Sequence, residues 1–188
     1  MTRTFIILYF LFSSLISLGQ SKETEGHIKW TEDYKLTWDD FQARARKTHF
    51  ASAMSDITFS VSVNTKGKYL IVYVQPSFNP KGSWAKEEDR VDELLKHEQV
   101  HFDIYEVNAR KLRQELQTKK LTAANSQSTV NKLMEKYGEL NIKVQERYDE
   151  ETEHSLKKEK QEKWNAQIEA ELIRLQEFKD PNFEVEMQ

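Results

Sequence analysis

The chain has 188 residues and a formal net charge of −3, with 28 lysine and arginine residues against 31 aspartate and glutamate residues. The two signs are mixed along the sequence, so the basic surface typical of nucleic-acid-binding proteins is missing, and nucleic acid is not an expected partner. Cysteine is absent, which excludes disulfides, thiolate metal sites and a lipidated cysteine.

The first nineteen residues have the pattern of a secretory signal peptide. Arg3 supplies a positive charge, and the apolar run at residues 5–18 is shorter than a bilayer-spanning helix requires. Small residues around Ser17 and Gly19 predict cleavage after Gly19. The expected mature protein is one domain, residues 20–188, exported to the periplasm or the extracellular space, with no stable membrane span after cleavage.

Residues 57–74 carry the signature of a β-hairpin. Apolar residues alternate with threonine and serine from Ile57 to Val63, which is the period of a half-buried strand. Turn-forming residues follow at 64–67, and residues 69–74 are β-branched and aromatic. Prolines within residues 75–83 predict a loop there, with Ser83 as the expected cap of the next helix.

Two long helical segments follow the hairpin. Acidic residues at 87–89 favour a helix start, and apolar residues then keep helical spacing to about Thr118. A polar turn at 122–129 precedes a second helix, with Ser126 or Ser128 as its expected cap.

The second helical segment contains two apolar stripes that are out of phase. One stripe ends at Tyr148, and the other begins at Trp164 about half a turn away around the helix. One straight helix cannot bury both, so we expect a break within residues 148–155 and a charged helix that resumes to about Phe178. Counting back from Trp164 along that helix predicts that His154 is at least partly buried.

The stretch HEQVH, residues 97–101, holds two of the five histidines of the chain. Positions i and i+4 share one helix face, so the imidazoles of His97 and His101 can converge on one cation. Glu98 is rotated by about 100°, which keeps it out of the first shell but within reach of a metal-bound water. Neutral imidazoles suit zinc, and the pattern is that of a zinc hydrolase whose glutamate is the general base.

A third ligand has to come from elsewhere in the chain. Asp103 and Glu106 point away from His101 on the same helix. If the chain turns back near Asn125, the antiparallel register brings residues 149–154 opposite His97. His154 is the favoured ligand because imidazole is common in zinc sites, and Asp149 and Glu150 are the carboxylate alternatives. Tyr105 and Tyr148 are possible hydrogen-bond donors to an oxyanion.

The chain resembles a family of exported bacterial proteins known as domain of unknown function 922 and described as predicted secreted zinc-dependent proteases. The resemblance is carried by LTWDDF at 36–41, SW at 83–84, LLKHEQVHFDIYEVNARKLR at 94–113 and YDEETEHS at 148–155, followed by Gln161 and Trp164. It implies a zincin-like α+β fold, with His97 and His101 as ligands and Glu98 as general base. It also implies that residues 148–155 belong to the site. Ser155 stands where glycine is expected in many relatives.

Two functions follow as hypotheses. The first is an exported zinc metallopeptidase, with an α+β fold of a small antiparallel sheet and long antiparallel helices, that acts on a peptide or protein substrate. The second is a non-catalytic helical interaction module in which the same metal pins the helices together. A structural zinc site is closed by four protein ligands, whereas a catalytic site keeps a position open, so the number of ligands discriminates between them.

Overall fold

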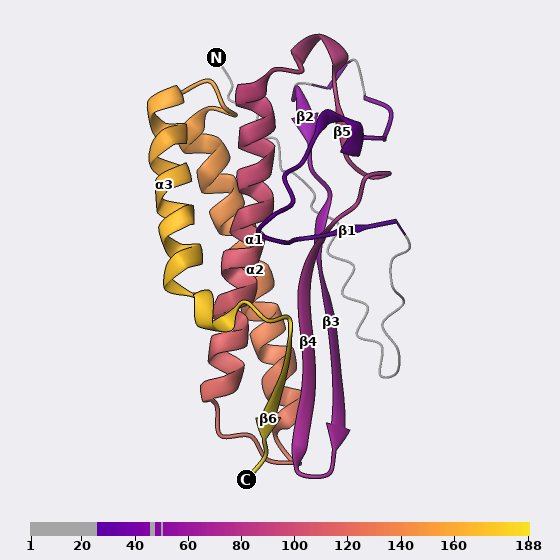
Figure 1. The fold of residues 1–188 in the computed structure, drawn as a ribbon, viewed down its shortest axis with the longest axis vertical. Helices are drawn as coiled ribbons and strands as arrows, with labels where there is room; N and C mark the ends of the chain where they lie inside the picture. The colour runs from indigo at the N-terminus through magenta and orange to yellow at the C-terminus, as the bar shows by residue number, and fades with distance from the viewer. Residues whose placement is uncertain (1–25, 46–47, 50) are drawn as a thin grey trace, which may run out of the picture.

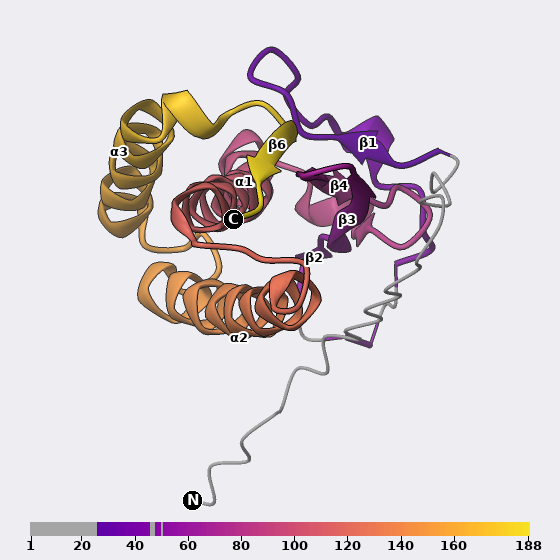
Figure 2. The same ribbon diagram turned by 90° about the horizontal axis from the view of Figure 1, so that it is seen from below.

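The computed structural model describes residues 26–45, 48–49 and 51–188, so the predicted signal peptide lies outside the described residues. Three helices stand beside a small antiparallel sheet (Figure 1). The helices are α1 (Asp92–Thr118), α2 (Ser126–Thr152) and α3 (Lys158–Arg174). Seen end-on, α1 lies between the sheet and α3, and α2 runs alongside α1 (Figure 2). The predicted α+β class, with long antiparallel helices packed on a hairpin, is confirmed.

The sheet is built on one long hairpin. Its strands pair over their whole length, from Ile57 opposite Phe78 to Lys66 opposite Tyr69, and Gly67 turns the chain with a φ of 59°. Two further strands pair with the second hairpin strand at its other edge, and a separate two-stranded sheet lies near the start of α1. The strands are β1 (Ile28–Lys29), β2 (Ala53–Met54), β3 (Ile57–Lys66), β4 (Tyr69–Phe78), β5 (Trp84–Ala85) and β6 (Asn182–Glu186).

The second hairpin strand is longer than predicted, because Pro76 lies inside β4 and not in a loop. The Pro76 carbonyl accepts a hydrogen bond from the Trp30 N–H, so this residue directs its backbone groups away from β3. In an antiparallel pair, the N–H and the C=O of one residue point to the same neighbouring strand. Pro76 faces the β1 side, so its lack of an N–H removes no hydrogen bond between β3 and β4.

The prediction that Ser83 caps the first long helix is also wrong. The Ser83 hydroxyl donates to the Asn79 carbonyl and accepts from the Asp56 N–H, which fixes a turn before β5. A short 3₁₀ segment, η2 (Glu87–Asp89), then precedes α1, whose N-cap is Val91. The predicted end of α1 at about Thr118 is confirmed. α2 begins at Ser126 with Asn125 as its N-cap, so the prediction that Ser126 or Ser128 caps this helix is wrong.

The predicted break in the second helical segment is confirmed. α2 ends at Thr152 and α3 begins at Lys158, so the two apolar stripes belong to different helices. Both stripes pack against α1: Tyr148 and Trp164 belong to one buried cluster with residues of α1, and the inner face of β4 packs on the far end of α1 and α2. Beyond α3 a 3₁₀ turn, η3 (Gln176–Phe178), leads into β6, which the sequence pattern did not indicate.

A buried ionic network holds α1 in register with its neighbours. Glu106 accepts hydrogen bonds from Arg110 and Arg113, one turn and two turns further along α1. Arg113 also donates to the Val74 carbonyl of β4, and Arg110 donates to the Leu172 carbonyl of α3. All three charged side chains are fully buried and satisfied, so truncating one partner would leave the others uncompensated.

Candidate metal centre

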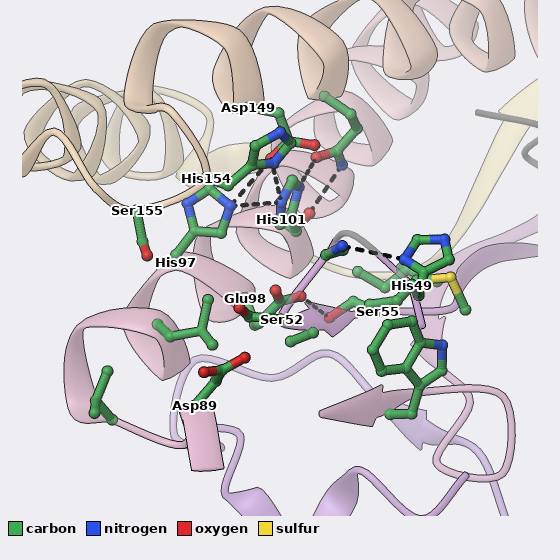
Figure 3. A pocket seen from close by; sticks show the side chains of 18 of the residues that line it. His49, Ser52, Ser55, Asp89, His97, Glu98, His101, Asp149, His154 and Ser155 are labelled. Carbon is green, nitrogen blue, oxygen red and sulfur yellow. Dashed lines mark hydrogen bonds and ion pairs between the residues drawn. The ribbon is translucent and has the colours of Figure 1, made fainter. Parts of the chain in front are cut away.

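The two histidines of HEQVH lie on the face of α1 that is turned toward α2 (Figure 3). His97 is buried, and its Nε2 atom lies 3.1 Å from Nε2 of His101. The rings are perpendicular, with centroids 4.7 Å apart. The convergence predicted from the i, i+4 spacing is therefore present, and both Nε2 atoms point to one place.

Asp149 of α2 supplies the third donor atom of this cluster. Its Oδ1 atom lies 3.0 Å from Nε2 of His97 and 3.0 Å from Nε2 of His101, so the three atoms form a nearly equilateral triangle. Donor atoms of a tetrahedral zinc site, each about 2.0–2.2 Å from the ion, are roughly 3.3–3.6 Å apart. The triangle fits such an ion with only a small expansion, and these residues are a group that can hold a metal.

Two glutamines orient the imidazoles from behind. Nδ1 of His97 lies 2.9 Å from Oε1 of Gln161 in α3, and Nδ1 of His101 contacts Oε1 of Gln145 in α2. The amide groups are themselves fixed, because Gln145 donates to the His101 carbonyl and Gln161 donates to the Tyr148 hydroxyl. Because an amide oxygen only accepts hydrogen bonds, each Nδ1 carries a hydrogen and donates a hydrogen bond to it, which leaves the Nε2 lone pairs for a cation.

These glutamines were missed as site residues by the sequence argument. One signal was available for Gln145, which is four residues before Asp149 and so shares its face of α2. Gln161 lies in a run of charged residues, and its neighbours from Lys157 to Lys163 are exposed, so the local sequence does not indicate a buried site residue there. Only the packing of α3 against α1 brings Gln161 behind His97.

Tyr148 is part of the support for His97. Its ring stacks on the imidazole with centroids 4.5 Å apart and an interplanar angle of 18°, and its hydroxyl donates to the His97 carbonyl. The side chain is fully buried, so the structure places this hydroxyl in the helix interface and not in the cavity. Burial raises the pKa of Tyr148 and of Tyr105, and Tyr105 does line the cavity described below.

The electrostatics of the cluster favour a positive charge. Burial by itself lowers the pKa of the His101 imidazole, but the neighbouring Asp149 carboxylate outweighs burial and raises that pKa to about 9. Burial acts to raise the pKa of Asp149, yet the surrounding imidazoles, chiefly His101, hold it well below its usual range. The cluster thus keeps a proton at neutral pH, and a divalent cation can take the place of that proton.

Glu98 faces a different direction from the two histidines, as the helix geometry predicts. It is 4% exposed, and its Oε2 atom accepts a hydrogen bond of 2.5 Å from the Ser55 hydroxyl, just after β2 (Figure 3). The bond holds one carboxylate oxygen against the wall formed by β2. Ser55 is a third site residue that the sequence did not indicate, because the contact joins segments 43 residues apart.

His154, the favoured third ligand in the sequence analysis, lies beside the triangle and not in it. Its Nδ1 atom is 3.5 Å from Oδ1 of Asp149, and its side chain is 59% exposed, so the prediction of burial is wrong. The prediction of burial requires a continuous helix from Trp164 back to His154, but α3 begins only at Lys158. Glu150, the other carboxylate alternative, is exposed and does not belong to the group.

The departure from helical geometry is a run of three left-handed residues. Glu153, His154 and Ser155 have φ angles of 48°, 52° and 76°, and they are the non-glycine residues with positive φ in the part of the chain that the structure describes. The Lys157 N–H returns to the Thr152 carbonyl across this turn. Such angles cost non-glycine residues roughly 1–2 kcal/mol each, so the turn that places His154 beside Asp149 is strained.

We expect Ser155→Gly to stabilise the protein by about 0.5–1 kcal/mol, since glycine adopts a φ of 76° without strain but loses more entropy on folding. For a domain of this size the gain corresponds to a rise in Tm of about 1–4 °C, measured by calorimetry. Ser128→Gly in the regular helix α2 is the matched control and should lower stability by about 0.5 kcal/mol. A loss of stability in Ser155→Gly contradicts the strained turn.

Comparison with known proteins places the chain in a family. A model of bacterial proteins of unknown function, DUF922, matches residues 12–155, which is most of the chain. The chain belongs to the DUF922 family. The match includes the described parts of the hairpin, α1, α2 and the left-handed turn, and it ends before α3. No curated protein and no solved structure matches the chain significantly.

In this DUF922 protein the cluster opens into a cavity of about 940 Å³, which is large enough for a ligand of several residues. Its walls come from the segment around β2, the start of α1 and the left-handed turn after α2. Glu98 and the three residues of the triangle all line it, and Asp89 and His49 lie at its lower and right-hand sides in Figure 3. Any molecule that fills the cavity therefore lies against both the candidate ligands and the carboxylate.

Proposed function

We propose that this protein is a zinc-dependent peptidase with a zincin-like arrangement, in which His97, His101 and Asp149 hold the ion and Glu98 is the general base. One observation carries the proposal: three donor atoms about 3 Å apart lie at the wall of a large cavity next to a buried, oriented carboxylate. Asp149 replaces His154 as the proposed third ligand, because its oxygen completes the triangle.

The proposed chemistry assigns each side chain a separate task. Zinc, when bound, lowers the pKa of a coordinated water to about 7 and polarises a substrate carbonyl. Glu98 accepts the proton of the attacking water and delivers it to the leaving amine. Ser55 is a positioning residue that holds one oxygen of Glu98, and the glutamines keep both imidazoles in the tautomer that leaves Nε2 unprotonated.

The direct test is hydrolysis of a mixed peptide library by the zinc-loaded protein, with the new termini identified by mass spectrometry. We expect cleavage that a chelator abolishes and zinc restores. Intact peptides after prolonged incubation with protein that contains one zinc per chain would contradict the proposal.

The second candidate, a structural metal site, is favoured by one observation. His154 lies 3.5 Å from Oδ1 of Asp149, close to the spacing of two ligands of one ion, so it can supply a fourth protein ligand and close the site. In that case the metal would join α1 to the end of α2 without catalysis.

We expect His154→Ala to keep two imidazoles in the zinc shell, as counted by X-ray absorption spectroscopy on wild type and variant. In the peptidase, His154 supports Asp149 from outside the first shell, and its loss weakens zinc binding by roughly 10–100-fold. A wild-type shell of three imidazoles that falls to two in His154→Ala would instead establish the closed structural site.

Export is proposed on the sequence pattern of residues 1–19 alone, which lie outside the described residues. Among the residues that the structure describes, no helix has the length and apolarity needed to cross a bilayer. An exported peptidase would meet its peptide substrates outside the cytoplasm, and an intact Met1 on protein recovered from the native host would contradict this part of the proposal.

A further inference from the structure

Large apolar side chains on the surface are concentrated around the cavity. Five large hydrophobic residues are exposed within the described part of the chain, and three of them, Met54, Val91 and Leu156, line this one cavity at exposures of 38%, 52% and 82%. They come from three separate segments: the end of β2, the residue before α1 and the turn after α2. Separate segments that direct apolar groups to one hollow are typical of a ligand site.

Val91 occupies a position where its side chain disfavours the helix. It is the N-cap of α1, and no side-chain hydrogen bond caps the helix there. Serine, threonine, aspartate and asparagine are strongly preferred at N-caps because their oxygens accept a hydrogen bond from the first turn, which valine cannot do. Val91 is thus unfavourable for the local stability of α1 and also lines the cavity. A residue that is unfavourable for the local structure is expected mainly at functional sites.

Leu156 is the most exposed of the three, and its position also depends on a costly conformation. It follows directly after the left-handed residues Glu153 to Ser155, which turn the chain outward beside the candidate ligands. Two independent departures from favourable local structure, one at Val91 and one before Leu156, therefore both place apolar groups around the same site.

The other residues that line the cavity indicate what a ligand in contact with Met54, Val91 and Leu156 would meet. Glu98 and the triangle of donor atoms line the same cavity as Met54, Val91 and Leu156, so a peptide that fills the cavity lies against the apolar side chains and the proposed reacting groups together. Carboxylates outnumber arginine in the lining of this cavity, with Glu88, Asp89, Glu98, Asp149 and Glu153 against Arg44. This excess of negative charge makes the cavity unfavourable for acidic side chains. The charge and apolarity of the lining both select against an acidic occupant.

We propose that Met54, Val91 and Leu156 form a specificity site for a large apolar side chain of the peptide substrate next to the scissile bond; this inference rests on the proposed function. The substrate class is thus a peptide with leucine, methionine or phenylalanine at that position, and peptides with aspartate there are rejected.

The test uses one peptide frame in which a single position beside the cleaved bond is leucine, phenylalanine, alanine or aspartate. We expect kcat/KM of the zinc-loaded full chain to be at least 10-fold higher for leucine and phenylalanine than for alanine, and lowest for aspartate. Val91→Ser and Leu156→Ser should each remove most of the preference for leucine over alanine. Ile173→Ser is the matched control, because Ile173 is 68% exposed on α3 and does not line the cavity.

A second measurement separates loss of specificity from loss of the fold. Serine restores a capping group at residue 91, so the Tm of Val91→Ser should not fall even though its selectivity does. An unfolded variant would lose activity on all four peptides equally. Equal kcat/KM for leucine and alanine peptides in the wild type overturns the inference while leaving the peptidase intact.

If no peptide is cleaved, the proposed function fails, and the inference is still tested by binding. Calorimetry with zinc-loaded Glu98→Gln and the same four peptides should show the same order of affinities, reduced to equality in Leu156→Ser. Peptide binding without any preference for the apolar residue overturns the inference separately from the catalytic proposal.

Discussion

Glu98→Gln is expected to lower kcat/KM for peptide hydrolysis by about 10³-fold, within the range that general-base catalysis contributes. The amide keeps the size of the carboxylate and can still contact the Ser55 hydroxyl, so the fold should be unchanged. It cannot accept a proton from water at neutral pH. Zinc content, measured by atomic emission, should stay at one ion per chain, because Glu98 is not among the three proposed ligands.

Glu146→Gln is the matched control for this experiment. Glu146 is an exposed glutamate in the last third of α2, and it directly follows Gln145, which contacts a candidate ligand. Its substitution should leave kcat/KM within a factor of two. Hydrolysis by Glu98→Gln at the wild-type rate, with zinc bound and the fold intact, would exclude Glu98 as the base and leave the metal-pinned module as the better account.

Asp149→Ala is expected to remove most of the stabilisation that zinc confers. At free zinc of about 1,000 times Kd, binding stabilises the wild type by about 4 kcal/mol, which is a rise in Tm on the order of 10 °C. Asp149 offers one of three ligand atoms, so its loss should weaken zinc binding by more than the roughly 100-fold that the loss of an outer-shell partner reaches. The same zinc concentration would then stabilise the variant by less than about 1.4 kcal/mol, so the rise in Tm should fall to a third of the wild-type shift or less.

Glu150→Ala tests whether Asp149 itself is the ligand. Glu150 is the adjacent carboxylate and was an alternative ligand on sequence grounds, but it is exposed and outside the cluster. Differential scanning calorimetry with and without zinc should therefore show the wild-type shift in Glu150→Ala. A full zinc shift in Asp149→Ala combined with a lost shift in Glu150→Ala would reverse the assignment and require a different register between α1 and α2.

Local patterns predicted the elements that are long and periodic. The alternation from Ile57 to Val63 indicated β3, and the helical spacing up to Thr118 located the end of α1. The phase difference between the stripes that contain Tyr148 and Trp164 indicated the break after α2. Each of these patterns is repeated over several turns or residue pairs, so it stands out without knowledge of any partner.

Short elements and single contacts were not predictable in this way. β1, β2 and β5 have two residues each, too few for any periodicity, and they exist because a neighbouring strand offers free backbone groups. β4 continues through Pro76 because the edge that faces β1 does not need a proline N–H. Such features depend on which strand lies alongside, and a local pattern carries no information about that.

The candidate metal centre also combines features that a local pattern predicts with features that depend on tertiary contacts. That His97 and His101 share a face, with Glu98 turned aside, follows from the 3.6-residue period of any α-helix, so their spacing was enough to predict it. The third donor atom was decided by tertiary structure: the packing of α2 on α1 brings Asp149 to both imidazoles, and the left-handed turn moves His154 out of the helical phase that favoured it. The difference lies in sequence separation. The period of a helix is visible within a few residues, whereas the contacts of Asp149, Gln161 and Ser55 join segments about 40–65 residues apart and form only when the helices and strands pack.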